Sequence, residues 1–147
     1  MVVARDGAEG VAVIDIALLL ALALGRPVGL VSTVYDVAGI DGVALVEYES
    51  RFNERAVRRE PRGFTSFGLF QLDSEWHPQW RDDLLLHIVE GASFWEACKA
   101  KAGGNIAVAF SWYNSGSPSK SIKKGLEVAR LRDRLARRIA EAYGVRE

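Results

Sequence analysis

Glu49 stands near the end of an apolar stretch, where a carboxyl group can take part in acid–base chemistry. The stretch, residues 39–50, reads GIDGVALVEYES and is typical of a helix with one broad apolar surface. A carboxyl group at the edge of a buried helix loses hydration, which raises its pKa toward neutral pH. A carboxylic acid kept protonated in an apolar cleft can donate its proton to a glycosidic oxygen. By itself, an acid at a helix end is usually only a solvated charge.

Two further segments carry groups suited to binding an N-acetyl sugar. Residues 68–72, GLFQL, combine a glycine, which lets the backbone approach a ligand, with Gln71, an amide in an apolar run. Residues 109–116, AFSWYNSG, end in Tyr113 and Asn114, a phenol and an amide that could face a cleft. Taken alone, each segment is equally explained as core followed by a turn or a helix cap.

In order and spacing, the three segments resemble the lysozyme superfamily, and in particular the catalytic domain of lytic transglycosylases. That family carries Glu-Ser at a helix end, then Gly-Leu-Met-Gln, then Ala-Tyr-Asn-Ala-Gly. This chain has ESRFN at residues 49–53, GLFQL at 68–72 and WYNSG at 112–116, and the resemblance covers roughly residues 38–118. It implies one mainly α-helical, lysozyme-like domain over residues 1–147, with at most a small β element.

A second resemblance, to goose-type lysozymes, lies within the first. Residues 67–77, FGLFQLDSEWH, are similar to a segment of that family in which Gly-Leu-Met-Gln is followed by Val-Asp and then by His. Residues 86–88, LHI, and Gly91 are similar to the Val-His-Ile and the glycine that come next in that family. Asp73 thereby matches an acidic position thought to help position water.

These resemblances assign roles to individual residues. Glu49 takes the role of the catalytic acid, and Tyr113 is expected to hydrogen-bond Glu49 or the sugar. Residues 68–71 should line the cleft, with Phe70 where the families usually have Met. The residues expected to contact the substrate are Ser50, Gly68, Leu69, Phe70, Gln71, Asp73, Tyr113 and Asn114.

The histidines and tryptophans are secondary candidates. His77 and His87 are expected to be structural rather than substrate contacts. Trp76 or Trp80 could stack on glycan because both follow the Gln71 segment directly, whereas Trp95 is expected in the core.

Three functions remain open. Both enzymatic candidates break the β-1,4 bond between N-acetylmuramic acid and N-acetylglucosamine, and the oxocarbenium-like transition state needs acid assistance. A hydrolase also needs a second carboxylate. The goose-type family's other acid falls at Arg62 here, with Glu60 only near in sequence. We therefore favour a lytic transglycosylase that uses Glu49 alone. The alternatives are a hydrolytic lysozyme using Asp73 and an inactive peptidoglycan-binding module.

The elements that must position these residues are mostly helical. Capping and stop signals, together with apolar periodicity, predict helices over residues 39–50, 84–102, 106–113 and 121–143. Residues 31–37 are β-branched and short, which favours a strand or an extended connector. Residues 64–72 favour an irregular or β-like turn region, and Asp73 with Ser74 could cap a short helix that runs to Trp80.

The N-terminal apolar run allows three interpretations. Residues 11–25, VAVIDIALLLALALG, have the length of a signal peptide but are shorter than the ~20 residues of a membrane-spanning helix. Asp15 lies inside the run and argues against a signal. A retained core helix, an uncleaved signal or anchor, and a misplaced start all remain open.

Composition fits a single soluble domain without a cofactor. The 147 residues carry 19 basic and 19 acidic side chains, so nothing indicates a nucleic-acid partner. Cys98 is the one cysteine, which excludes an intramolecular disulfide and a thiolate metal site. The basic excess in residues 120–147 is either a solvated helix face or a loose attraction to an anionic wall polymer or membrane. We expect a monomer that acts on peptidoglycan in the bacterial cell envelope or periplasm, or after secretion.

Overall fold

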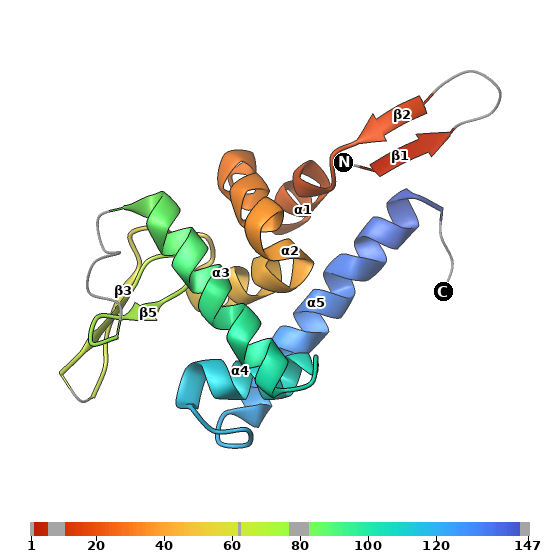
Figure 1. The fold of residues 1–147 in the computed structure, drawn as a ribbon. Coiled ribbons are helices and arrows are strands. Elements are labelled where there is room, and N and C mark those ends of the chain that lie inside the picture. The colour runs from red at the N-terminus through yellow and green to blue at the C-terminus, as the bar shows by residue number, and fades with distance from the viewer. Residues whose placement is uncertain (1, 6–10, 62, 77–82, 145–147) are drawn as a thin grey trace.

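The computed structural model is mainly α-helical with small β elements, as the sequence predicts. It describes residues 2–5, 11–61, 63–76 and 83–144. The helices pack together, a small sheet lies on one side, and a hairpin stands at the N-terminal end (Figure 1). The helices are α1 (Ile16–Leu24), α2 (Val28–Ser50), α3 (Leu84–Lys101), α4 (Ile106–Ser115) and α5 (Ile122–Ala142). The strands are β1 (Val2–Arg5), β2 (Val11–Ile14), β3 (Val57–Arg59), β4 (Thr65–Phe67) and β5 (Leu72–Asp73).

Both sheets are antiparallel and local in sequence. β1 pairs with β2, and the second sheet has the order β3-β4-β5. In its register, Phe67 lies opposite Val57 on one side and Leu72 on the other. The expected β-like region over residues 64–72 is thus confirmed. The short helix expected after Asp73 is wrong for residues 74–76, which form a turn, and the rest of it lies outside the described residues.

Side-chain caps fix where three of the helices begin. Asp15 accepts from the backbone N–H of Ala17 at 2.9 Å, ahead of α1. Asp83 and Asn105 cap α3 and α4 in the same way. The cap at Asp15 divides the N-terminal apolar run into strand β2 and helix α1, because its carboxylate satisfies N–H groups that the helix leaves unpaired. The retained core helix that the sequence allowed is thus present over residues 16–24, with four residues buried, but it does not extend over residues 11–14.

Helix α2 contains a break at Gly39. This residue has φ 66° and ψ −168°, which only glycine adopts without strain. The helix predicted from residue 39 to residue 50 is present after the break. The strand or connector predicted for residues 31–37 is wrong, because Val31, Val34 and Ala38 fall three and four residues apart and are buried on one side of a helix.

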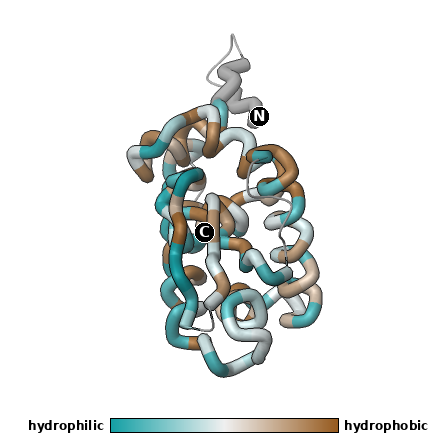
Figure 2. The backbone as a smooth tube through the Cα atoms, turned by 90° about the vertical axis from the view of Figure 1, so that its left-hand side faces the viewer, coloured by the Kyte–Doolittle hydropathy of each residue, from teal (hydrophilic) through white to brown (hydrophobic). Residues whose placement is uncertain are grey.

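The core lies between α2, α3 and α4, with α5 packed against α1, α2 and α4. Residues 43–46 of α2 are fully buried, and Trp95 of α3 and Phe110 of α4 are among the largest fully buried side chains. Hydrophobic and hydrophilic positions alternate along the helices around this core (Figure 2). Among the described residues, α2 alone is long and apolar enough to cross a membrane, a test that core helices and signal sequences also pass.

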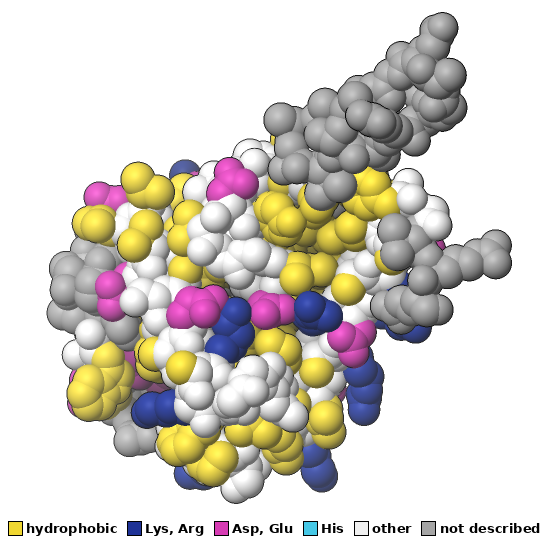
Figure 3. Space-filling view, turned by 45° about the vertical axis from the view of Figure 1, so that its right-hand side comes forward, with side chains coloured by type: hydrophobic (Ala, Val, Ile, Leu, Met, Phe, Trp, Pro, Cys, Tyr) yellow, Lys and Arg dark blue, Asp and Glu magenta, His cyan; other side chains and the backbone are white. Residues whose placement is uncertain are grey.

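Ion pairs join three of the helices at the surface. Asp41 of α2 contacts Lys99 Nζ of α3 at 3.2 Å and Arg132 Nε of α5 at 2.9 Å. Glu96 and Asp133 extend this network at its two ends. Acidic and basic side chains alternate among apolar ones on the face drawn in Figure 3. The network fixes α5 beside α2, which is the helix that carries Glu49.

The contact between α4 and α5 depends on Gly125. A methyl group at this buried position would overlap the backbone carbonyl of Ala107. We expect Gly125→Ala to lower the free energy of unfolding by about 1–3 kcal/mol, since the two helices would have to separate. Urea denaturation measures this change. Gly29→Ala is the matched control: Gly29 is exposed, with nothing within 4 Å of the added carbon, so its substitution should be neutral or slightly stabilising. Equal stability of the two variants would contradict this account of the contact.

Candidate functional site

Glu49 lies in the last turn of α2 and is buried despite its charge. Its side chain is 5% exposed. Helix α2 ends at the next residue, and Arg51 turns the chain away with a left-handed φ of 51°. Burial, reinforced by the charge of Glu60, raises the pKa of Glu49 to about 7, although the charges of Arg58 and Lys124 act in the opposite direction. A large fraction of Glu49 is therefore protonated near neutral pH, and it can serve as a proton donor.

Three charged residues from two other elements surround this acid. Arg58 of β3 places Nη2 3.9 Å from Glu49 Oε2, and its own side chain is half-exposed. Lys124 belongs to the first turn of α5. Glu60 follows β3 and accepts a hydrogen bond from the Ser66 hydroxyl at 2.8 Å. The acid thus lies between the small sheet and the start of α5. Sequence spacing did not identify Arg58 or Lys124.

The segment predicted to bind sugar, residues 68–71, forms a tight turn held from two helices. The N–H of Phe70 donates to Nε2 of His87 in α3 at 2.9 Å. The hydroxyl of Tyr113 in α4 donates to the carbonyl oxygen of Phe70. Gln71 has a φ of 49°, and its amide donates to the carbonyl of Gly68 at 2.9 Å. Both sides of Phe70 are therefore fixed by side chains distant in sequence.

Gly68 is required for a packing reason. It has a φ of 78°, and a side-chain carbon at this position would overlap the imidazole ring of His87. The expectation that His87 is structural agrees with its buried place beneath the turn. His77, the other histidine, lies outside the described residues.

Tyr113 donates a hydrogen bond to the turn and is also affected by the charge of Glu49. Its pKa is raised well above the usual value by burial and, secondarily, by the negative charge of Glu49. The phenol therefore stays neutral and donates a hydrogen bond. Of the two partners predicted for this hydroxyl, Glu49 or the sugar, Glu49 does not receive its hydrogen bond in this structure, where the hydroxyl donates to the carbonyl oxygen of Phe70.

Other residues that were predicted to contact the substrate pack or form hydrogen bonds within the protein instead. Leu69 and Phe70 are fully buried, so their side chains belong to the core and cannot line a cleft. The Ser50 hydroxyl donates to the carbonyl of Val46, one turn earlier in α2. Asn114 is exposed in the last turn of α4 and accepts from the Ser121 hydroxyl at 2.7 Å. Residues 68–71 are all buried, and both peptide groups of Phe70 are hydrogen-bonded within the protein, so the turn supports its surroundings rather than offering backbone groups to a ligand.

The charge of Asp73 is not among those that shift the pKa of Glu49. It accepts from the N–H of Glu75 at 2.8 Å and caps its own turn. The described charges that shift the pKa of Glu49 come from Arg58, Lys124 and Glu60, not from Asp73. The second carboxylate beside the acid is therefore Glu60, which the sequence marked only as near the expected position.

The tryptophans divide between surface and core. Trp76 is 72% exposed and free to stack on a ligand, whereas Trp95 is fully buried, as expected. Trp112 lies beneath Lys101, whose Nζ is 5.0 Å from the ring centroid. Trp80 lies outside the described residues.

Metal-ligating side chains do not gather in the described part of the chain. No group of three or more His, Cys, Asp or Glu residues there could hold a metal ion. Cys98 is buried, and burial raises the pKa of its thiol to about 11, so it is a poor nucleophile.

No family model, curated protein or solved structure matches this chain. The resemblance to lytic transglycosylases therefore rests on the three short motifs. The functional assignment must rest on the chemistry of the residues around Glu49.

Burial of Glu49 has a measurable cost that depends on pH. Because burial raises the pKa of Glu49 from its usual 4.5 to about 7, ionising Glu49 destabilises the fold. This destabilisation is absent below about pH 4.5, grows as the pH rises, and reaches about 3 kcal/mol above pH 7. Glu49→Gln should therefore raise the free energy of unfolding at about pH 8 and change it little near pH 4.5. Urea titrations at several pH values measure this.

Glu47→Gln is the control for that experiment. Glu47 lies two residues earlier in α2 and forms an ion pair with Arg26 at 2.7 Å. Its substitution should lower stability near pH 8, the opposite sign. If Glu49→Gln also lowered stability at that pH, the buried-acid account would be wrong.

Proposed function

We propose that this protein is a peptidoglycan lytic transglycosylase in which Glu49 is both the general acid and the general base. The observation that carries the proposal is the burial of Glu49, which raises its pKa to about 7 even with Arg58 Nη2 3.9 Å from its carboxyl group. A general acid works best when its pKa lies near the operating pH. The order of the three motifs agrees with this reaction. The substrate places the activity in the bacterial cell envelope, in the periplasm or outside the cell.

The reaction needs one proton donor that later accepts a proton. Glu49 donates its proton to the bridging oxygen as the bond from muramic acid C1 to that oxygen breaks. The Glu49 carboxylate then removes the proton from the 6-hydroxyl of the same muramic acid. The oxygen of that hydroxyl bonds to C1 and closes a 1,6-anhydro ring, so no water is consumed.

The surrounding structure supports these steps by fixing groups whose charges or dipoles act on the acid. The hydroxyl of Tyr113 is held by the carbonyl oxygen of Phe70, so the phenol that responds to the charge of Glu49 keeps a fixed place. Arg58 and Lys124 favour the ionised carboxylate that exists after the first proton transfer.

Hydrolysis with Glu60 as the second carboxylate is the alternative, and one observation favours it. The charge of Glu60 acts on Glu49, and Ser66 orients the Glu60 carboxylate. A carboxylate in this place could position a water molecule for attack on C1. An inactive peptidoglycan-binding module requires neither acid.

Removal of the proposed acid tests the enzymatic proposal. We expect Glu49→Gln to abolish release of muropeptides from purified sacculi while binding to sacculi persists, because the amide keeps the shape and cannot donate a carboxylic proton. Wild-type cleavage should fall as the pH rises above about 7, since the protonated acid is the active form. Mass spectrometry measures the products. Wild-type turnover by Glu49→Gln would refute the assignment, and a wild-type protein that binds without releasing product would support the inert module.

The end groups of the products separate the two reactions. A transglycosylase releases 1,6-anhydro ends, whereas a hydrolase releases reducing ends. We expect anhydro ends from the wild type, and from Glu60→Gln at an activity within about tenfold, because Glu60 only tunes the pKa of Glu49. Asp73→Asn is the matched carboxylate control and should leave both activity and product unchanged. Reducing ends that disappear with Glu60→Gln would instead establish hydrolysis.

A further inference from the structure

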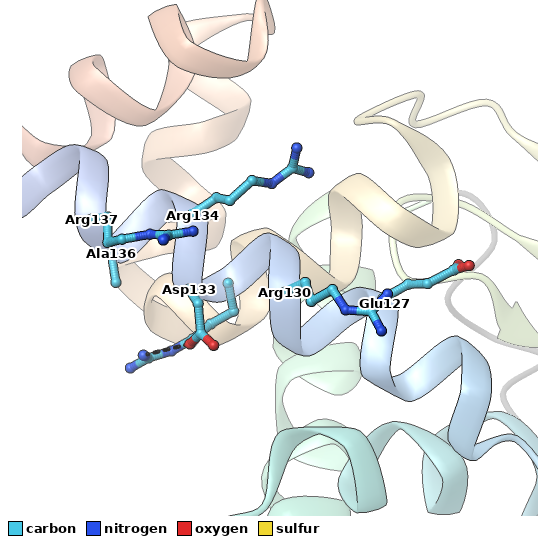
Figure 4. A pocket seen from close by; sticks show the side chains of 7 residues that line it. Glu127, Arg130, Asp133, Arg134, Ala136 and Arg137 are labelled. Atoms are coloured by element: carbon cyan, nitrogen blue, oxygen red, sulfur yellow. Dashed lines mark ion pairs between the residues drawn. The ribbon is translucent and has the colours of Figure 1, made fainter.

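A shallow cavity of about 750 Å³, open to solvent, lies on the surface of α5, outside the residues assigned to the catalytic site (Figure 4). All its lining residues belong to this one helix, and four of them are arginines. One of the four, Arg132, is held by Asp41 and Asp133 in the ion-pair network described above. The other three form no ion pair with another described residue.

The arginine face consists of Arg130, Arg134 and Arg137. All three are exposed, and none forms an ion pair with another described residue. Figure 4 shows their side chains extending from successive turns of α5. Like charges spaced three and four residues apart on a helix repel each other, so this arrangement disfavours the isolated helix. An anionic ligand would remove that repulsion.

Helix α5, which carries the arginine face, packs against α2, the helix whose last turn holds Glu49. Lys124, in the first turn of α5, acts on the charge of Glu49. Glu127, one turn further on, lines the cavity. Burial, with the charge of Glu127 next in effect, raises the pKa of Tyr48, the residue before Glu49. From Glu127 to Arg137 the helix extends about 15 Å. A polymer lying at Glu49 and running along α5 would thus meet the arginines.

We propose that the arginine face binds carboxylates of the peptide stems on the glycan strand whose bond lies at Glu49. This inference rests on the proposed function, since that function supplies the strand. Arginine pairs with carboxylates through two parallel N–H donors, and its guanidinium remains charged at any relevant pH. Stem peptides carry several carboxylates in each repeat, whereas a polymer of N-acetylglucosamine carries none.

A lipid surface fits this face less well than a polymer does. Helices that lie on membranes place large apolar side chains beside their basic residues. On α5, the exposed large hydrophobic residue is Leu126, near the start of the helix. The exposed leucines of α1, Leu18 and Leu22, belong to another element.

The test compares binding of two variants to sacculi under conditions without cleavage. The first variant combines three substitutions in the Glu49→Gln background: Arg130→Gln, Arg134→Gln and Arg137→Gln. Sedimentation measures binding to intact sacculi, and fluorescence anisotropy measures binding to labelled soluble glycan strands, with their stems and after an amidase has removed them. We expect the triple substitution to weaken binding to sacculi and to stem-bearing strands by about tenfold. On strands without stems, and in high salt, the effect should become small.

A second triple variant controls for overall charge. Arg55→Gln, Lys101→Gln and Lys120→Gln remove the same charge from exposed positions elsewhere, and binding should change by less than about twofold. Equal losses in the two triple variants would overturn the proposal, as would no loss in the first. A loss confined to vesicles of anionic phospholipid, with sacculus binding unchanged, would overturn it in favour of a lipid surface.

Failure of this inference is separable from failure of the proposed function. Absence of any cleavage product from the wild type contradicts the enzyme, but a stem-dependent loss in the arginine variant still establishes the binding face. Normal cleavage with unchanged binding contradicts the arginine face alone.

Discussion

The loss of hydration at Glu49 is the interaction on which the proposed chemistry depends. A carboxylate exposed to water would be ionised at neutral pH and could not donate a proton. Here the acid is enclosed at the point where α2, the central helix, meets the small sheet and the start of α5. The packing of residues 43–46 in the core fixes the helix, and the helix fixes the acid. The fold therefore bears the cost of a buried carboxyl group to keep a neutral donor in place.

The peptide groups of Phe70 form the second constraint. One hydrogen bond from its N–H to His87 and one to its carbonyl from Tyr113 fasten the turn to α3 and α4. The side chain of Phe70 lies against Gly91, where any larger residue would overlap the ring. The turn is consequently held in place from two helices although it is a loop.

Helix α5 has different partners on its different sides. Its apolar side, with Val128 and Leu135, closes the core. Arg132 joins the ion pairs that hold it to α2 through Asp41. Arg130, Arg134 and Arg137, on its outer side, form no ion pair with another residue in the described part of the chain. Some sides of α5 thus stabilise the fold, and its outer side is available to an anionic polymer.

Local signals in the sequence determined most of the helices, while the environment of the acid was decided by tertiary contacts. The cap at Asp83 and the stop before Asn105 act within a few residues, so the limits of α3 and α4 were predictable. The motifs also marked Glu49 itself. Burial turned residues 31–37 into helix against their β preference and placed Phe70 in the core, because packing outweighs propensity. Only the folded chain brings Lys124 beside Glu49, since no local pattern encodes contacts between residues 75 positions apart.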